Sequence, residues 1–277
     1  MSKVDLHCHS NVSDGVLAPA AVAQYAHQAG VTTWALTDHD EVGGIAQART
    51  AAQALGMRFV PGVEVSITWA NTTVHIVGLQ IDETNAALLK GLAETRDGRD
   101  ARGREMAEQL ARAGIPGAYE GALKYVDNPD LMSRTHFARY LVECGACKNI
   151  PEVFRRFLVE GKPGYVPHRW ASLEHAVGWI QAAGGIAVVA HPGRYKFSAL
   201  QEDALFDQFR DLGGNAIEVV TGSHSPDQYA TYAQVAKRYG FLASRGTDFH
   251  APGESRVDFA VLPELPAGLT PVWHDWA

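Results

Sequence analysis

The sequence predicts an α/β barrel of the (β/α) type that is interrupted by one helical insertion. Seven short runs with the composition of β-strands recur along the 277 residues, and most of them are separated by alanine-rich helical segments. This alternation is typical of βα units that share one sheet. Residues 85–165 break the rhythm, because they offer several helical patterns and no clear strand.

The predicted strands are rich in β-branched and aromatic residues, and their lengths are typical of strands in a buried sheet. In chain order they cover residues 3–9, 32–38, 58–67, 72–79, 185–192, 215–222 and 240–248. Strands that alternate with helices imply a parallel sheet. Seven of them over this chain length fit a closed barrel better than an open sheet.

The helical segments between these strands carry their own end signals. Residues 18–30 and 227–240 are alanine-rich, and each segment ends in a glycine, Gly30 and Gly240. Glycine suits the left-handed residue that often follows the last turn of a helix. We therefore expect helices after the first strand and before the seventh.

Residues 85–165 are expected to form a helical insertion domain, while residues 1–84 and 166–277 form the barrel. Glycine and proline bound its helical patterns. The insertion is locally basic because it contains Arg96, Arg99, Arg102, Arg104, Arg134 and Arg139. Charged helices usually just face solvent. The contrast with the acidic remainder of the chain leaves contact with an anionic substrate open.

Composition excludes several classes of partner. The formal net charge is -7 and the hydrophobic fraction is 46%. An acidic chain does not suit duplex DNA or an anionic membrane, which select basic surfaces. The most apolar run, residues 176–190, is too short and too rich in glycine to span a bilayer. Since no basic and apolar leader opens the sequence, we expect a cytoplasmic protein.

Histidines and carboxylates concentrate on the predicted strands and just after them. The C-terminal ends of barrel strands gather at one mouth, so residues far apart in the chain would meet there. A single histidine is usually structural, but repetition in successive βα units indicates a metal centre. The candidate ligands are His7, His9, Asp14, His39, Glu64, His75, His191, Asp248 and His250.

These side chains indicate the kind of metal and the number of ions. Imidazoles with carboxylates favour manganese, with iron or zinc as alternatives. Nine ligands exceed the roughly four to six that one ion uses, so two or three divalent ions are expected. Three ions and three carboxylates leave a cationic pocket that would attract phosphate. Clustered divalent ions activate water and hold the attacking and leaving oxygens of a phosphoester.

Six motifs resemble, in order, those of the polymerase and histidinol phosphatase (PHP) family, a branch of the amidohydrolase superfamily. They are DLHCHSNVSDG, ALTDHD, GVEVS, HIVG, VAHPGRY and GTDFH. The resemblance runs nearly end to end and implies a distorted (β/α)7 barrel. Within the family the chain is most similar to stand-alone nucleoside 3',5'-bisphosphate phosphatases, a group that includes enzymes trimming short RNAs from the 5' end.

The resemblance also implies roles for individual residues. It assigns His7, His9, Glu64 and Asp248 to one ion, Glu64, His75 and His191 to a second, and Asp14, His39 and His250 to a third. Asp14 and His224 are the expected catalytic residues, with His224 as the acid for the leaving oxygen. Arg134 and His224 are expected to contact phosphate. Arg99 and Arg102 could reach a second phosphate or could be plain surface charge.

The expected function is a metal-dependent phosphatase that removes the 3'-phosphate of a nucleotide such as 3'-phosphoadenosine 5'-phosphate. One alternative is a 5'-3' exoribonuclease that acts on short single-stranded RNA with the same centre. A second alternative is a non-catalytic, metal-bound accessory domain. Histidinol phosphatase fits less well, because a basic insertion suits a doubly anionic ligand. No duplex DNA and no membrane are expected as partners.

Overall fold

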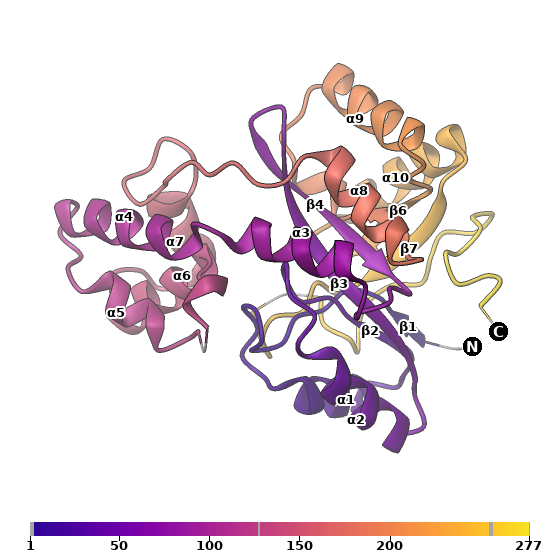
Figure 1. Ribbon diagram of the computed structural model, residues 1–277, viewed down its shortest axis with the longest axis horizontal. Coiled ribbons are helices and arrows are strands. Elements are labelled where there is room, and N and C mark those ends of the chain that lie inside the picture. The colour runs from indigo at the N-terminus through magenta and orange to yellow at the C-terminus, as the bar shows by residue number, and fades with distance from the viewer. Residues whose placement is uncertain (1–2, 127, 255–256, 277) are drawn as a thin grey trace.

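The fold is a nearly closed, seven-stranded barrel, seen in a computed structural model that describes residues 3–126, 128–254 and 257–276 (Figure 1). Within these residues the strands pair in chain order. They are β1 (Lys3–Asp5), β2 (Val31–Leu36), β3 (Arg58–Trp69), β4 (Thr72–Leu79), β5 (Ile186–Val189), β6 (Ala216–Thr221) and β7 (Leu242–Gly246). The predicted α/β class and distorted (β/α)7 barrel are confirmed.

Backbone hydrogen bonds at the C-terminal ends of β1 and β7, and just beyond them, close the seam between the first and last strands. Leu6 N–H donates to the Arg245 carbonyl at 3.0 Å, and Asp248 N–H donates to the His7 carbonyl at 2.8 Å. His9 N–H then donates to the Phe249 carbonyl at 2.8 Å. The residues that follow β1 and β7 are therefore held side by side.

The expectation of a wholly parallel sheet is wrong at β4, which runs antiparallel to both β3 and β5. Only Ala70 and Asn71 separate β3 from β4, and a parallel crossover needs a dozen residues or more. Both residues have positive φ, 45° and 60°, as tight two-residue hairpin turns require. Because of the reversal, the N-terminal half of β4 brings His75 to the mouth where the other strands end.

Helices surround the barrel and end where the glycines predict. α1 ends at Gln28, two residues before Gly30, and α10 is followed directly by Gly240, and both glycines have positive φ. The barrel helices are α1 (Pro19–Gln28), α2 (Ile45–Ala54), α3 (Ala86–Arg96), α8 (Leu173–Ala182), α9 (Ala199–Asp211) and α10 (Pro226–Tyr239). No helix in the described part of the chain is both long and apolar enough to cross a membrane.

The remaining helices form a group beside the barrel with an apolar core of its own (Figure 1). They are α4 (Arg99–Arg112), α5 (Ala118–Leu123), α6 (Arg134–Glu143) and α7 (Ile150–Val153), with a 3₁₀ turn at Pro129–Leu131 and a π-helical turn at Phe154–Leu158. Met106, Leu110 and Phe137 are buried in this second core. α3 differs, since Leu88 and Leu92 pack in the main core of the barrel.

Gly246 allows the barrel to close against the residues after β1. A Cβ atom at position 246 would lie 2.3 Å from the Cβ of His7 and 2.6 Å from its backbone nitrogen. Gly246→Ala must therefore push β7 away from His7, and we expect it to lower the free energy of unfolding by about 1–3 kcal/mol. Urea denaturation measures this loss.

The matched control for that prediction is Gly178→Ala in α8. A Cβ at position 178 would meet no atom within 4 Å. Alanine in an open helix interior should be neutral or stabilising by about 0.5–1 kcal/mol. Equal urea midpoints for the two variants would contradict the close approach at the seam.

Candidate metal centre and active site

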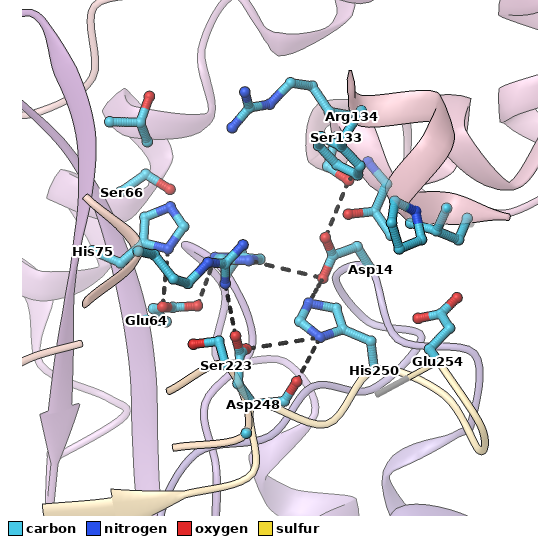
Figure 2. A pocket seen from close by; sticks show the side chains of 18 of the residues that line it. Asp14, Glu64, Ser66, His75, Ser133, Arg134, Ser223, Asp248, His250 and Glu254 are labelled. Atoms are coloured by element: carbon cyan, nitrogen blue, oxygen red, sulfur yellow. Dashed lines mark hydrogen bonds and ion pairs between the residues drawn. The ribbon is translucent and has the colours of Figure 1, made fainter. Parts of the chain in front are cut away.

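The structure brings the nine predicted ligands to one mouth of the barrel, although they come from six separate segments. Loops after β1, β2, β5 and β7 supply most of them, and the hairpin strands β3 and β4 supply Glu64 and His75. Figure 2 shows Asp14, Glu64, His75, Asp248 and His250 around a shared central space. His7, His9, Asp14, Glu64 and His191 are buried.

The first cluster has the geometry of a tetrahedral cation site. His9 Nε2 lies 3.2 Å from His7 Nε2, 3.3 Å from Glu64 Oε2 and 3.1 Å from Asp248 Oδ1. His7 Nε2 lies 3.2 Å from Glu64 Oε2 and 3.5 Å from Asp248 Oδ1. Four atoms that bind one ion tetrahedrally at about 2.0–2.2 Å are about 3.3–3.6 Å apart. The observed spacings therefore fit a single divalent cation.

The second cluster forms on the other oxygen of Glu64. Glu64 Oε1 lies 3.0 Å from His75 Nδ1 and 3.0 Å from His191 Nε2, and these two nitrogens are 3.3 Å apart. The three atoms make a compact triangle of the same size as the first cluster. The two oxygens of Glu64 thus face two different groups of histidines.

The third cluster is wider. Asp14 Oδ1 lies 3.1 Å from His250 Nε2, 3.9 Å from His39 Nε2 and 4.0 Å from His9 Nδ1. His39 also turns its other nitrogen, Nδ1, to within 3.0 Å of Glu64 Oε2. His39 therefore lies between this cluster and the first one.

Several buried atoms of these clusters have no hydrogen-bond partner in the described part of the chain. They are His9 Nδ1, Asp14 Oδ1, His39 Nδ1, Glu64 Oε2 and His191 Nδ1. A buried polar atom without a partner costs about 1–3 kcal/mol. Carboxylate and imidazole lone pairs at close spacing are the donor set that divalent metals prefer. The residues present therefore fit bound divalent cations.

The electrostatics keep the three carboxylates ionised. Burial alone would raise the pKa of Glu64, but His7, His75 and His39 outweigh it and hold the pKa well below its usual range. The pKa of Asp14 is lowered in the same way, chiefly by His250 and His39. For Asp248, His7 and His9 outweigh burial and lower the pKa. All three side chains are therefore anionic at neutral pH.

The surroundings of His191 and His7 shift the pKa values of these two imidazoles in opposite directions. Burial, helped by Arg194, lowers the pKa of His191 to about 3, so this ring stays neutral. Burial would also lower the pKa of His7, but Glu64 and Glu218 reverse this and raise it well above its usual value. A cation at the first cluster would displace that proton, because metal ligands bind in their deprotonated form.

Glu218 is a functional residue that the sequence reasoning missed. Its Oε1 lies 2.7 Å from His7 Nδ1, and its Oε2 accepts a hydrogen bond from His191 N–H at 2.6 Å. A carboxylate that accepts a hydrogen bond from the Nδ1–H of a histidine leaves Nε2 free and oriented toward a metal. The signal for it was present, since Glu218 is the lone charged residue in the apolar strand AIEVVT.

Backbone strain accumulates at the strand ends that carry the site. Asp40, His191 and Asp248 all have positive φ, at 50°, 27° and 56°. Such conformations cost about 1–3 kcal/mol and persist where surrounding contacts enforce them. Asp40 N–H donates to the Glu64 carbonyl at 2.9 Å, and Asp248 N–H is held by His7. These bonds fix the positions from which the site side chains project.

A cavity of about 420 Å³ opens above the clusters, and its opposite wall is basic. Arg99 and Arg102 of α4 and Arg134 of α6 line this wall, while Arg194 lines the cavity on the ligand side, beside Asp248. Arg99 pairs with Asp40, but neither Arg102 nor Arg134 has an acidic partner within the described residues. Burial, together with Arg134 and Arg99, lowers the pKa of Arg102 to about 9. The wall therefore presents positive charge that an anion would stabilise.

The structure holds Arg102 and Arg134 in place through uncharged contacts. Arg102 Nε donates to the Val166 carbonyl at 3.0 Å, and its guanidinium lies 5.4 Å from the ring centre of Trp170. Arg134 lies 5.7 Å from the ring centre of Phe154. Figure 2 shows Arg134 across the cavity from Asp248. Both cations are positioned without being neutralised.

His224 is not brought to the cavity, and the expectation that it contacts phosphate or acts as an acid finds no support in the geometry. Its Nδ1–H donates to the Val219 carbonyl at 3.1 Å, and its Nε2 accepts from Gly193 N–H at 3.0 Å. The ring stacks on Tyr232 with centres 4.9 Å apart. Both nitrogens are occupied, so His224 supports the turn that precedes Arg194.

The neutral state of His224 predicts a pH effect on stability. Burial lowers its pKa to about 4, whereas an unfolded histidine has a pKa of about 6.5. The unfolded chain therefore binds the proton first as the pH falls. The stability contributed by neutral His224 is complete above about pH 6.5 and is lost toward pH 4.

We expect His224→Gln to reduce this acid sensitivity, because an amide offers a donor and an acceptor but does not titrate. The variant should lose less unfolding free energy between pH 6.5 and 5, by up to about 1.4 kcal/mol per pH unit. Urea denaturation of both proteins across this range measures the difference. Parallel stability curves would show that His224 does not titrate as described.

Comparisons with known proteins agree with this site. Residues 5–222 match the PHP domain family. A 3',5'-nucleoside bisphosphate phosphatase of Chromobacterium violaceum is 50% identical over 275 residues, which cover 99% of this chain and 96% of that protein. The 5'-3' exoribonuclease Rnm of Escherichia coli is 41% identical over 274 residues, covering 98% of this chain and 93% of the relative.

The solved structure of an amidohydrolase from Chromobacterium violaceum, with bound sulfate and no metal, is also similar. It superposes with a TM-score of 0.95 at 50% identity and covers 98% of this chain and 95% of that one. The chain therefore belongs to the PHP domain family, as its motifs predicted. It is a hydrolase, which sets aside the non-catalytic accessory domain.

Proposed function

We propose that this protein removes the 3'-phosphate from nucleoside 3',5'-bisphosphates, such as 3'-phosphoadenosine 5'-phosphate, and leaves AMP and inorganic phosphate. One observation carries the proposal: the ligand clusters face two half-buried arginines, Arg102 and Arg134, across a cavity of about 420 Å³, and neither has an acidic partner within the described residues. A substrate with two phosphates can place one at each wall. The phosphatase from Chromobacterium violaceum supports this substrate class.

The proposed centre binds up to three divalent ions, with manganese as the first choice and iron or zinc as alternatives. When bound, such ions lower the pKa of water and neutralise the charge on a phosphoryl group. His7, His9, Glu64 and Asp248 would hold one ion, and His75 and His191 would hold another with Glu64. Asp14, His39 and His250 would hold the third at the edge of the cavity.

The other residues bind and orient the substrate. The insertion, residues 85–165, supplies Arg102 and Arg134, which we assign to the phosphate that is not cleaved. Arg99 stays bound to Asp40 and packs on Trp170, with its guanidinium 4.4 Å from the ring centre, so it supports the wall. His224 positions the turn before Arg194, whose Nη1 lies 2.8 Å from Asp248 Oδ2.

The substrate assignment is tested with purified protein supplied with manganese. Phosphate release is measured from 3'-phosphoadenosine 5'-phosphate, AMP and histidinol phosphate. We expect the bisphosphate to react far faster than the other two compounds. Faster reaction of histidinol phosphate or AMP would refute the assignment.

A second candidate function, 5'-3' exonuclease action on short RNA, is favoured by a second hollow beside the cavity. It has a volume of about 890 Å³ and shares Thr73 with the central cavity. Tyr165, His168 and Arg169 line it, and planar or cationic side chains of this kind suit single-stranded nucleotides. The exoribonuclease from Escherichia coli supports this reading.

A gel separates the two candidates. A short RNA with a 5'-phosphate and a labelled 3' end is incubated with the manganese-loaded protein. Progressive shortening from the 5' end would establish exonuclease action. An intact oligonucleotide, under conditions in which the bisphosphate is hydrolysed, would restrict the protein to mononucleotides.

A further inference from the structure

We propose that helix α6 is a positioning element for the Asp14–His250 side of the metal centre and that it acts through His136 and Arg139. The inference rests on the proposed function only in taking Asp14 and His250 as metal ligands. His136 and Arg139 are buried and lie outside the lining of the cavity, so neither would touch substrate. Their contacts lead instead to the loops that carry the ligands.

Arg139 joins two loops that are far apart in the sequence. Its Nη1 donates to the Asp14 carbonyl at 2.6 Å. Its Nε and Nη2 donate to the two oxygens of Glu254 at 3.1 and 3.3 Å. Asp14 follows β1, and Glu254 follows β7 on the loop that carries His250. The planar guanidinium therefore holds both loops in one orientation, which a lysine could not do.

His136 holds the loop after β1 at Ser13, the residue before Asp14. Its Nδ1 accepts from Ser133 N–H at 3.0 Å, which places the ring proton on Nε2. Nε2–H then donates to the Ser13 carbonyl at 3.1 Å. Two neighbouring backbone carbonyls, those of Ser13 and Asp14, are thus held by two side chains one turn apart on α6.

The start of α6 also orients the carboxylate itself. Ser133 Oγ donates to Asp14 Oδ2 at 3.2 Å, which leaves Oδ1 facing His250 Nε2 at 3.1 Å. Figure 2 shows Ser133 and Arg134 beside Asp14 at one edge of the cavity. Because Arg134 directly follows Ser133, one helical turn carries both an anion-binding side chain and the group that orients Asp14.

This arrangement predicts which cation depends on α6. The Asp14 cluster is the widest of the three, with spacings of up to 4.0 Å, and its ligands come from loops. The other two clusters are built around Glu64 on β3 and have spacings of 3.0–3.5 Å. The cation at Asp14 should therefore bind most weakly and respond most to changes in α6.

The test is a manganese titration of the metal-free full-length protein, read by calorimetry and by metal content after dialysis. In Arg139→Lys we expect the most weakly bound ion to bind about 10–100-fold more weakly, while the tighter binding is unchanged. His136→Gln should act in the same direction. The control is Arg112→Lys on α4, whose exposed side chain pairs with Glu108 at 3.7 Å.

Kinetics distinguish positioning from a purely structural role. If Arg139 positions a metal ligand, excess manganese should restore kcat of Arg139→Lys, while KM for the bisphosphate stays near its original value. A structural role would lower thermal stability and kcat without rescue by metal. Glu254→Gln provides the decisive variant if Arg139→Lys does not fold, because Glu254 is partly exposed and its amide keeps the shape.

The proposal would be overturned if these variants bound manganese just as the unaltered protein does. The titration curves of His136→Gln and of the Arg139 or Glu254 variant would then superimpose on the curve of the unaltered protein. Metal binding is measured here without substrate. A wrong substrate assignment would appear in the phosphate-release panel and would leave this test intact.

Discussion

Glu64→Gln should lower turnover by about 10³-fold or more, the largest effect expected from any single change in this protein. Glu64 lies within 3.3 Å of five histidines, namely His7, His9, His39, His75 and His191. An amide carries no negative charge and replaces one ligand oxygen by a nitrogen that cannot bind a cation. Since outer partners of metal ligands already contribute about 10–100-fold, a ligand shared by two clusters should contribute more.

The measurement pairs kcat with metal content. We expect Glu64→Gln to retain fewer bound ions while its far-ultraviolet circular dichroism stays unchanged. Glu108→Gln is the matched control, because this carboxylate is exposed on α4 and pairs with the exposed Arg112 at 3.7 Å. A Glu64→Gln protein with full metal content and full turnover would contradict the role of Glu64 as a shared ligand.

Arg102→Ala and Arg134→Ala should selectively impair substrates that carry a second phosphate. A charge-assisted hydrogen bond contributes about 1.5–3 kcal/mol, which corresponds to a loss of about 10–150-fold in kcat/KM. Adenosine 3'-phosphate lacks the 5'-phosphate, so the same variants should process it almost as well as the unaltered protein. Comparison of both substrates across both variants measures the interaction directly.

The control for the arginine variants is Arg104→Ala, an exposed arginine on α4 that pairs with Asp100 at 3.0 Å. It should leave both substrates unaffected. Equal losses on the bisphosphate and on adenosine 3'-phosphate would indicate that Arg102 and Arg134 bind the phosphate that is cleaved. The orientation of substrate proposed above would then be reversed.

The convergence of the nine side chains could be predicted because it depends on where residues fall relative to strands. His7 and His9 alternate on one side of an extended segment, and His191 and Asp248 follow buried strands. Barrel topology then brings strand ends together whatever their separation in sequence. His75 reached the same mouth for a different reason, because a two-residue turn reverses β4.

The supporting residues could not be predicted in the same way. Glu218 acts through hydrogen bonds to His7 and His191 that exist only once three strands are aligned. His224 follows the sixth predicted strand and was expected to contact phosphate, but two backbone groups occupy its ring. Arg99 and Arg102 are one helical turn apart, and only the fold shows that Asp40 neutralises the first of them.

The most direct test of the central claim is anomalous X-ray scattering from crystals of the protein grown with manganese. We predict one peak bounded by His7, His9, Glu64 and Asp248, and a second peak on the other oxygen of Glu64 beside His75 and His191. The account would be contradicted by a crystal in which manganese is fully occupied at other sites but gives no anomalous peak in contact with Glu64.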